Sequence, residues 1–331
     1  MRSLLALMLT AMLAACAAPA AAVAVSQASP LPSQTAAPTP RPPATATDTV
    51  TPAPTFTATP APTPQSSCLE GQAVCILDGH FLFQRPIGAQ DVYVLDKTYR
   101  FGTTQSGVRE PHHGVEFPNK RGTPVLAAQA GRVVFAGDDK AATLAWMPHF
   151  YGNVVMIEHH LPLMQAPIYS LYAHLDEVLA HEGDSVAAGD VIGRVGATGT
   201  AIGSHLHFEV RLAPLDYAST LNPELWMAPL DGTGVLAGRI QDAQGNVVKS
   251  AFNLQQVVAN QVSPMSFADS VTYEAKDRLS VQGDPLWHEN FAIGDLPAGE
   301  YRISLLYNGT LYEQFVTVEP GRLTFMVFVL N

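Results

Sequence analysis

Short apolar runs alternate with Gly, Pro, Asp and Asn from Cys75 onward, and no long stretch carries a helical period. Apolar runs bounded by turn residues are typical of β-strands. We expect strands over Val125–Ala128, Gly131–Phe135, Asn153–Ile157 and His205–Val210. The pattern therefore predicts a mostly β fold class, with a first β domain over residues 67–225.

A second β pattern begins near Asp231. Gly238–Val248 reads as strand, turn and strand, and Asn308-Gly309 lies between two apolar runs. Asn-Gly flanked by such runs is a strong hairpin signal, because both residues accept the positive φ angles of a tight turn. We expect a small β-sandwich over residues 231–331.

The start of the chain has the pattern of a targeting segment. Arg2 precedes an apolar run from Leu4 to Ala15, which is too short to span a bilayer as a stable helix. The run ends in Leu13-Ala14-Ala15-Cys16, which resembles a bacterial lipobox. The resemblance implies a signal peptide over residues 1–15, and a lipidated Cys16 that anchors an exported protein to the cell envelope. The alternative is a plain signal peptide with a chance cysteine.

Residues 16–66 consist mainly of Ala, Pro, Thr, Ser, Val and Gln, and only Arg41 and Asp48 carry charge. Such a segment has too few large apolar residues to bury a core, so we expect a disordered, extended tether. At roughly 3 Å per residue its reach is at most about 150 Å. The tether is expected to separate the membrane anchor from the folded domains.

Two cysteines remain, Cys68 and Cys75. Disulfides persist in exported proteins, and a pair seven positions apart can close a small loop. We expect a Cys68–Cys75 disulfide, because no histidine lies between the two residues and the spacing is not that of a zinc ribbon.

Charge excludes one class of partner. Charged residues make up 14% of the 331 residues and the formal net charge is -11. Nucleic-acid binding needs clustered Lys and Arg, so we expect no nucleic-acid partner.

Ten of the 11 histidines lie between His80 and His207, which makes this region the candidate for metal or acid–base chemistry. His112 and Glu116 are four residues apart. On a flat strand they would lie about 13 Å apart, too far for joint ligation, so a shared ligand would require a bend that Gly114 would allow.

In a strand, His205, His207 and Glu209 point to one face, while the apolar residues between them point to a core. This pattern indicates either a metal or catalytic site, or a surface strand with a chance histidine pair. His174, at the end of another predicted strand, is by itself more typical of a structural histidine.

Taken in order, these pieces resemble the lysostaphin/LytM-type zinc metallopeptidases, whose antiparallel fold is called the duplicated hybrid motif. The resemblance covers about 120 residues, from Tyr99 to Val210. Its pieces are His112–Glu116, Tyr151–Asn153, Tyr172–Leu175, a Gly-rich turn over Gly193–Gly199, and His205–Glu209.

The resemblance implies that His112, Glu116 and His207 ligate one Zn²⁺. Glu116 occupies the position of an aspartate in that family, and glutamate also ligates zinc. Three protein ligands leave the fourth tetrahedral position open, as in catalytic zinc sites. His174 and His205 match two non-ligand catalytic histidines, and Tyr99 matches a tyrosine that helps hold the oxyanion.

The remaining histidines of this region have no implied chemistry. We expect His113, at a variable position of the motif, to be exposed. We expect His159, at the end of a strand, to be structural or to line the groove.

The implied function is a zinc metalloendopeptidase that cuts peptide stems or cross-bridges of peptidoglycan. The alternative is a catalytically weak LytM-type module that binds the wall or regulates another wall hydrolase. In the C-terminal region, Phe291–Tyr301 resembles the carboxypeptidase-regulatory-like (transthyretin-like) sandwiches, which implies a fold but no catalytic residues.

Overall fold

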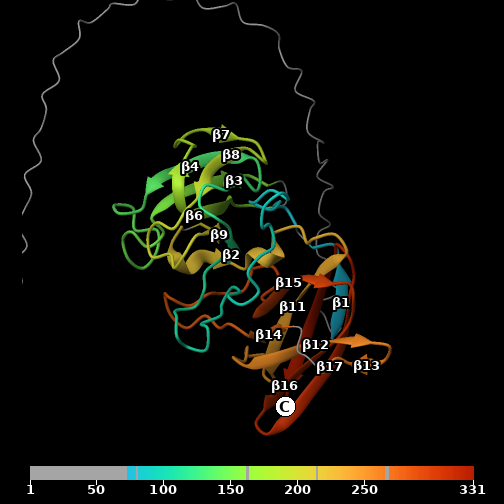
Figure 1. Ribbon diagram of the computed structural model, residues 1–331. Helices are drawn as coiled ribbons and strands as arrows, with labels where there is room; N and C mark the ends of the chain where they lie inside the picture. Colours follow the sequence, from blue (N-terminus) through green and yellow to red (C-terminus); the bar gives the residue numbers. More distant parts are fainter. Residues whose placement is uncertain (1–72, 80, 162–163, 214, 265–267) are drawn as a thin grey trace, which may run out of the picture. The chain divides into compact units, whose positions relative to one another are not determined.

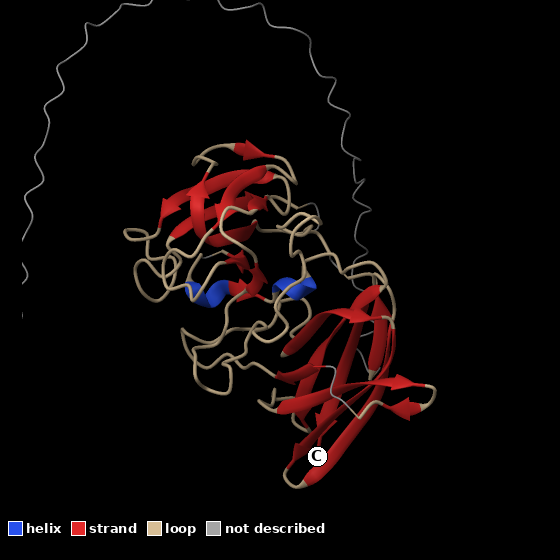
Figure 2. Ribbon diagram, in the orientation of Figure 1, coloured by secondary structure: helices blue, strands red, loops and turns tan. Residues whose placement is uncertain are grey.

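The computed structural model describes residues 73–331 except 80, 162–163, 214 and 265–267. Within these ranges the regular structure is almost all strand, and the only helices are the short 3-10 helices Tyr217–Ser219 and Pro223–Leu225 (Figure 2). The predicted mostly β fold class is confirmed. No helix among the described residues is long and apolar enough to cross a bilayer.

The predicted signal peptide, Cys16, the tether and Cys68 all lie outside the described residues. Cys75 is disulfide-bonded. Its pairing with Cys68 stays a prediction. The described residues all fall in one of the two units into which the chain divides, Phe56–Asn331.

A nine-stranded sheet, antiparallel throughout, forms the central part of the chain (Figure 1). Its main path runs β10 (Thr220–Leu221), β9 (His205–Leu212), β6 (Ile168–Val178), β5 (Asn153–His159), β4 (Gly131–Asp138) and β7 (Ser185–Val186). Off this path, β2 (Val115–Pro118) pairs with β9, β8 (Val191–Val195) with β6, and β3 (Pro124–Leu126) with β8. All four strands predicted here occur, with ends shifted by a few residues.

Alternation along β9 separates core from site. Leu206, Phe208 and Val210 are fully buried and belong to the main hydrophobic core. The residues between them point to the opposite face, as a strand's period of two requires. Core packing on one face therefore fixes which face carries the histidines, since a register slip of one residue would exchange them.

Two further sheets lie in the C-terminal part of the chain. The four-stranded sheet has the order β1 (Val74–Leu77), β18 (Leu323–Leu330), β11 (Thr233–Asp242) and β15 (Phe291–Pro297). The five-stranded sheet has the path β13 (Gln261–Val262), β12 (Ala251–Val258), β16 (Gly299–Tyr307) and β17 (Thr310–Val318), with β14 (Ala268–Val271) paired to β12. β1 precedes the nine-stranded sheet in the chain but pairs with β18, so this sheet combines both ends of the described chain.

The predicted hairpin at Asn308-Gly309 is confirmed. Tyr307 pairs with Thr310 across the turn, and Asn308 and Gly309 have φ angles of 48° and 79°. The assignment of the two C-terminal sheets to the carboxypeptidase-regulatory-like family stays a prediction.

The four-stranded sheet is buried on both faces. In β11, Val235 and Ala237 pack in the core shared with the nine-stranded sheet, whereas Leu236 and Ile240 pack in the core between the two C-terminal sheets. This double burial explains why β18 is an almost unbroken apolar run, because a strand covered on both sides does not alternate with polar residues.

Removing one core ring of β9 tests this packing. Phe208→Ala is expected to lower the free energy of unfolding by about 3–5 kcal/mol, because it leaves a cavity in a site with no exposed surface. Urea denaturation followed by circular dichroism measures the change. Phe315→Ala is the matched control, since its ring is 59% exposed, and it should change stability by about 0.5 kcal/mol or less. Equal losses for the two variants would contradict the proposed core.

Candidate metal centre and cleft

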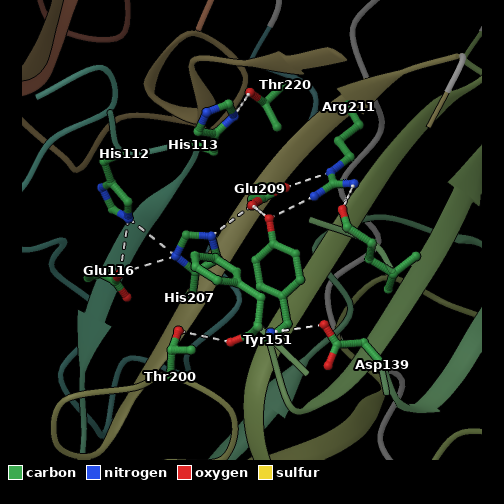
Figure 3. Close-up of polar contacts among 12 residues, drawn as sticks. His112, His113, Glu116, Asp139, Tyr151, Thr200, His207, Glu209, Arg211 and Thr220 are labelled. Carbon is green, nitrogen blue, oxygen red and sulfur yellow. Dashed lines mark hydrogen bonds and ion pairs between the residues drawn. The ribbon is translucent and has the colours of Figure 1, made fainter. Parts of the chain in front are cut away.

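Three side chains expected to act together do converge. Glu116 of β2 and His207 of β9 are directly opposite in the antiparallel ladder, and His112 precedes β2. Glu116 Oε1 lies 3.0 Å from His112 Nε2 and 3.1 Å from His207 Nδ1, and the two nitrogens are 3.2 Å apart (Figure 3). The three ligand atoms therefore point toward a single position.

Gly114 permits this approach mainly through the absence of a side chain. A Cβ atom at Gly114 would lie 2.5 Å from the Phe208 carbonyl oxygen and 2.8 Å from the His207 ring. Any larger residue would push β2 and the His207 imidazole apart. The sequence pattern predicted that Gly114 would allow a bend, and the structure adds this close contact.

The outer nitrogen of each candidate histidine ligand is held by an acceptor. His112 Nδ1 lies 2.8 Å from the Tyr99 carbonyl oxygen, and His207 Nε2 lies 2.9 Å from Glu209 Oε1. A carbonyl or carboxylate oxygen only accepts, so these nitrogens donate. The opposite nitrogens are left to face the shared position, where their lone pairs would bind a cation in place of a proton, which is how second partners orient metal-binding histidines.

This donor set fits zinc. Bonds of about 2.0–2.2 Å in a tetrahedron place the ligand atoms about 3.3–3.6 Å apart, slightly more than the separations of 3.0–3.2 Å seen here. Burial by itself would lower the pKa of His207, but Glu116 and Glu209 outweigh it and raise that pKa to about 9. Burial would likewise raise the pKa of Glu116, yet the charge of His207 and hydrogen bonds from three histidines hold it well below its usual range. The cluster thus favours a positive charge at its centre.

A buried network supports His207 from behind. Arg211 Nε donates to Glu209 Oε2 at 2.6 Å, and Arg211 Nη2 donates to the Tyr151 hydroxyl at 2.8 Å. The Tyr151 hydroxyl in turn donates to Glu209 Oε1. Burial would raise the pKa of Glu209, but Arg211 and His207 hold it well below its usual range. Sequence reasoning placed Glu209 on the histidine face without a role and did not consider Arg211, although the same alternation points to both.

His174 and His205 lie beside the three candidate ligands. Their ring centroids are 4.9 Å apart, and His205 Nε2 lies 3.0 Å from Glu116 Oε2. His174 donates from Nδ1 to the Thr198 carbonyl at 2.9 Å, which leaves Nε2 as its free nitrogen. Burial, followed by the charges of His207 and His205, lowers the pKa of His174 to about 3, so this ring is neutral.

The backbone of His174 has a φ angle of 61°, a conformation that non-glycine residues rarely adopt. Its amide donates to the Tyr151 carbonyl at 3.0 Å, which helps to hold it there. Strained residues of this kind concentrate at functional sites.

Tyr99 lies against His112, the first candidate ligand. Its ring stacks on His112, with 3.9 Å between centroids and 9° between planes. Burial raises the pKa of the Tyr99 hydroxyl, which therefore stays protonated and able to donate. Tyr99, His112, Glu116, His174, His205 and His207 all line one cleft of about 490 Å³.

One expectation is wrong. His113 is buried, because its ring stacks on Tyr217 with 3.6 Å between centroids and both its nitrogens have partners, the Thr220 hydroxyl at 2.8 Å and the Leu279 carbonyl at 3.0 Å. Burial lowers the pKa of His113 to about 4.

His159 is also buried. It bonds to the Ala130 carbonyl and the Ser170 hydroxyl, and it does not line the cleft. This placement agrees with a structural role.

Comparison with known proteins supports this assignment of the domain. Residues 110–223 match the model of Peptidase family M23. This segment spans from just before His112 to the end of the nine-stranded sheet, and it includes the three converging side chains and the two further histidines. The match supports a peptidase domain of the M23 type in the middle of the chain.

Three curated relatives are each similar to about a third of the chain. The DD-carboxypeptidase/endopeptidase Mpg of Neisseria meningitidis is 39% identical over 101 residues, 30% of this chain and 20% of Mpg. The uncharacterized lipoprotein YgeR of Escherichia coli is 34% identical over 35% of this chain and 39% of YgeR. The murein hydrolase activator NlpD of Escherichia coli is 33% identical over 34% of this chain and 24% of NlpD. The chain thus spans well under half the length of each of these relatives.

The support that Glu209 gives to His207 can be tested by measuring the zinc affinity of a Glu209 variant. Glu209→Gln removes the negative charge that polarises His207, so zinc affinity is expected to fall about 10–100-fold. Competition with a chromophoric chelator measures the zinc affinity. Glu177→Gln is the matched control, because Glu177 is 55% exposed and pairs with Arg194 away from the site. An unchanged affinity for Glu209→Gln would show that the buried network does not act on the metal.

Proposed function

We propose that this protein is a zinc metalloendopeptidase that hydrolyses peptide bonds in the stems or cross-bridges of peptidoglycan. The single observation that supports it best is the convergence of His112, Glu116 and His207 on one position inside a cleft that two further histidines line. The similarity to Mpg, whose name describes a DD-carboxypeptidase and endopeptidase, supports peptide-bond hydrolysis as the reaction, and the similarity to NlpD, a murein hydrolase activator by its name, supports a role at the wall.

In this proposal His112, Glu116 and His207 hold one Zn²⁺. When bound there, zinc polarises the scissile carbonyl and lowers the pKa of water to about 7. The remaining residues move protons and orient the substrate.

The hydrogen bonds favour a different acid–base role for each of the two histidines, His174 and His205. His174 has its Nε2 free for the proton of the attacking water, because Nδ1 is committed to the Thr198 carbonyl. His205 donates from Nδ1 to the Gly203 carbonyl at 3.1 Å, and its Nε2 faces the Glu116 carboxylate. It is the more exposed of the two and would return a proton to the leaving amine. The protonated Tyr99 hydroxyl would donate to the oxyanion.

The location is part of the same proposal. Export and lipidation at Cys16 would hold the enzyme to the cell envelope, with contact to the membrane through the lipid alone and with peptidoglycan as its partner. The similarity to YgeR, a lipoprotein by its name, supports this location.

The similarity to NlpD favours a second candidate, a module that regulates another wall hydrolase. All ligand and acid–base positions are occupied in this chain, which supports the enzyme over the regulator. The glutamate at position 116 does not weaken this argument, since its carboxylate still reaches both imidazoles.

Two histidine variants separate binding from catalysis. His207→Ala is expected to lose zinc, which is measured by metal analysis of the purified chain. His205→Ala is expected to keep zinc but to release new amino groups from purified peptidoglycan about 10²–10⁴ times more slowly, because it loses a proton donor.

His160→Ala is the control for both variants, since its side chain is 74% exposed and pairs only with Glu158. It should match the wild type in metal content and rate. A wild-type protein that releases no amino groups, but accelerates a separate wall hydrolase, would replace the enzyme with the regulator.

A further inference from the structure

His112 is the only one of the three proposed ligands that lies outside a strand. Its place therefore depends on the loop that carries it. The Gly102 amide donates to the His112 carbonyl at 2.8 Å, and the His112 amide donates to the Thr103 carbonyl at 3.0 Å. Whatever fixes residues 99–103 thus also fixes the backbone of His112.

A tyrosine of the C-terminal region lies directly behind this loop. A Cβ atom at Gly102 would lie 2.7 Å from Tyr273 Cδ1, so the backbone of the loop is in contact with that ring. The Tyr273 ring also meets the Phe101 ring edge to face, with 5.3 Å between centroids. Phe101, Tyr273 and Val281 form a small buried cluster of their own.

The same C-terminal segment also contacts the residue next to His112. The Leu279 carbonyl accepts a hydrogen bond from His113 Nε2 at 3.0 Å. Because that oxygen only accepts, Nε2 carries the proton and Nδ1 accepts from the Thr220 hydroxyl. His113 is thus fixed in one tautomer and one orientation, immediately beside the ligand.

The segment is itself anchored to the C-terminal sheets. The Tyr273 amide donates to the Asn290 carbonyl at 2.8 Å, and the Tyr273 hydroxyl donates to Glu289. The Asn290 side chain bonds both the amide and the carbonyl of Ile240 in β11, at 2.9 Å and 3.0 Å. A continuous set of contacts therefore runs from the four-stranded sheet to the loop of His112.

We infer that residues 273–281, between β14 and β15, are a positioning element of the metal centre, through which the C-terminal region holds the His112 ligand in place. The inference rests on the proposed zinc site. It gives the C-terminal sheets a function: the centre needs them to keep one of its ligands in register with the other two.

Zinc affinity of the full chain tests this role. Tyr273→Leu removes the ring behind Gly102 and is expected to weaken zinc binding about 10–100-fold, the range seen when support of a ligand is lost. Tyr273→Phe keeps the ring and should restore affinity to within about twofold of the wild type. Tyr301→Leu is the matched control, since Tyr301 is a buried tyrosine of the other C-terminal core, and it too should stay within about twofold.

The visible absorption of bound Co²⁺ provides a second readout, because a loss of folding stability alone does not change the spectrum of the folded site. Tyr273→Leu should change the intensity of this absorption, whereas Tyr301→Leu should not. A folded Tyr273→Leu variant with wild-type zinc affinity and an unchanged Co²⁺ spectrum would overturn the inference.

If Tyr273→Leu does not fold, Asp277→Ala decides the question. Asp277 is exposed, and its carboxylate accepts from the Leu279 amide at 2.9 Å and shapes the turn that presents the Leu279 carbonyl. Weaker zinc binding in this variant supports the inference and unchanged binding overturns it. A wild-type chain that binds no zinc would instead refute the proposed metal site, and the inference with it.

Discussion

The carboxylate of Glu116 lies between the imidazoles of His112 and His207, and the rest of the site depends on this contact. A buried carboxylate costs several kcal/mol unless donors or a cation compensate it. The ladder register of β2 and β9 places Glu116 opposite His207, and Gly114 leaves room for the His207 ring. The main-chain fold thus brings one carboxylate and two imidazoles together at a position that favours a positive charge.

One face of β9 continues this pattern of compensating polar contacts away from the candidate metal position. His207, Glu209 and Arg211 follow one another at intervals of two, and each is bonded to the next by a buried contact. Arg211 and Glu209 compensate each other's charge, so removing Glu209 would leave the buried Arg211 without its carboxylate partner, a loss that costs about 3–5 kcal/mol. The opposite face of the strand packs in the main core. The same strand therefore contributes both the hydrophobic packing and the electrostatic support of the proposed ligand.

Much of the strand pattern could be predicted from the sequence, because each strand and turn depends on the periodicity of neighbouring residues. The alternation of β9, the hairpin at Asn308-Gly309 and the strands of the central sheet follow from neighbouring residues. The burial of His113 could not be predicted in this way, since its partners Thr220 and Leu279 lie 107 and 166 residues away. The pairing of β1 with β18 could not be predicted either, because the two strands are separated by almost the whole described chain.

The C-terminal sheets share a core with the nine-stranded sheet and, through residues 273–281, contact the loop of His112, so they are structurally part of the site's surroundings.

The claim on which the whole account depends is that two imidazoles and one carboxylate bind one zinc ion. X-ray absorption at the zinc edge tests it most directly on the purified full chain. The account predicts one zinc with two imidazole nitrogens and oxygen ligands at about 2.0–2.2 Å. A spectrum with sulfur ligands or with a single imidazole, or a chain that takes up no zinc, would contradict it.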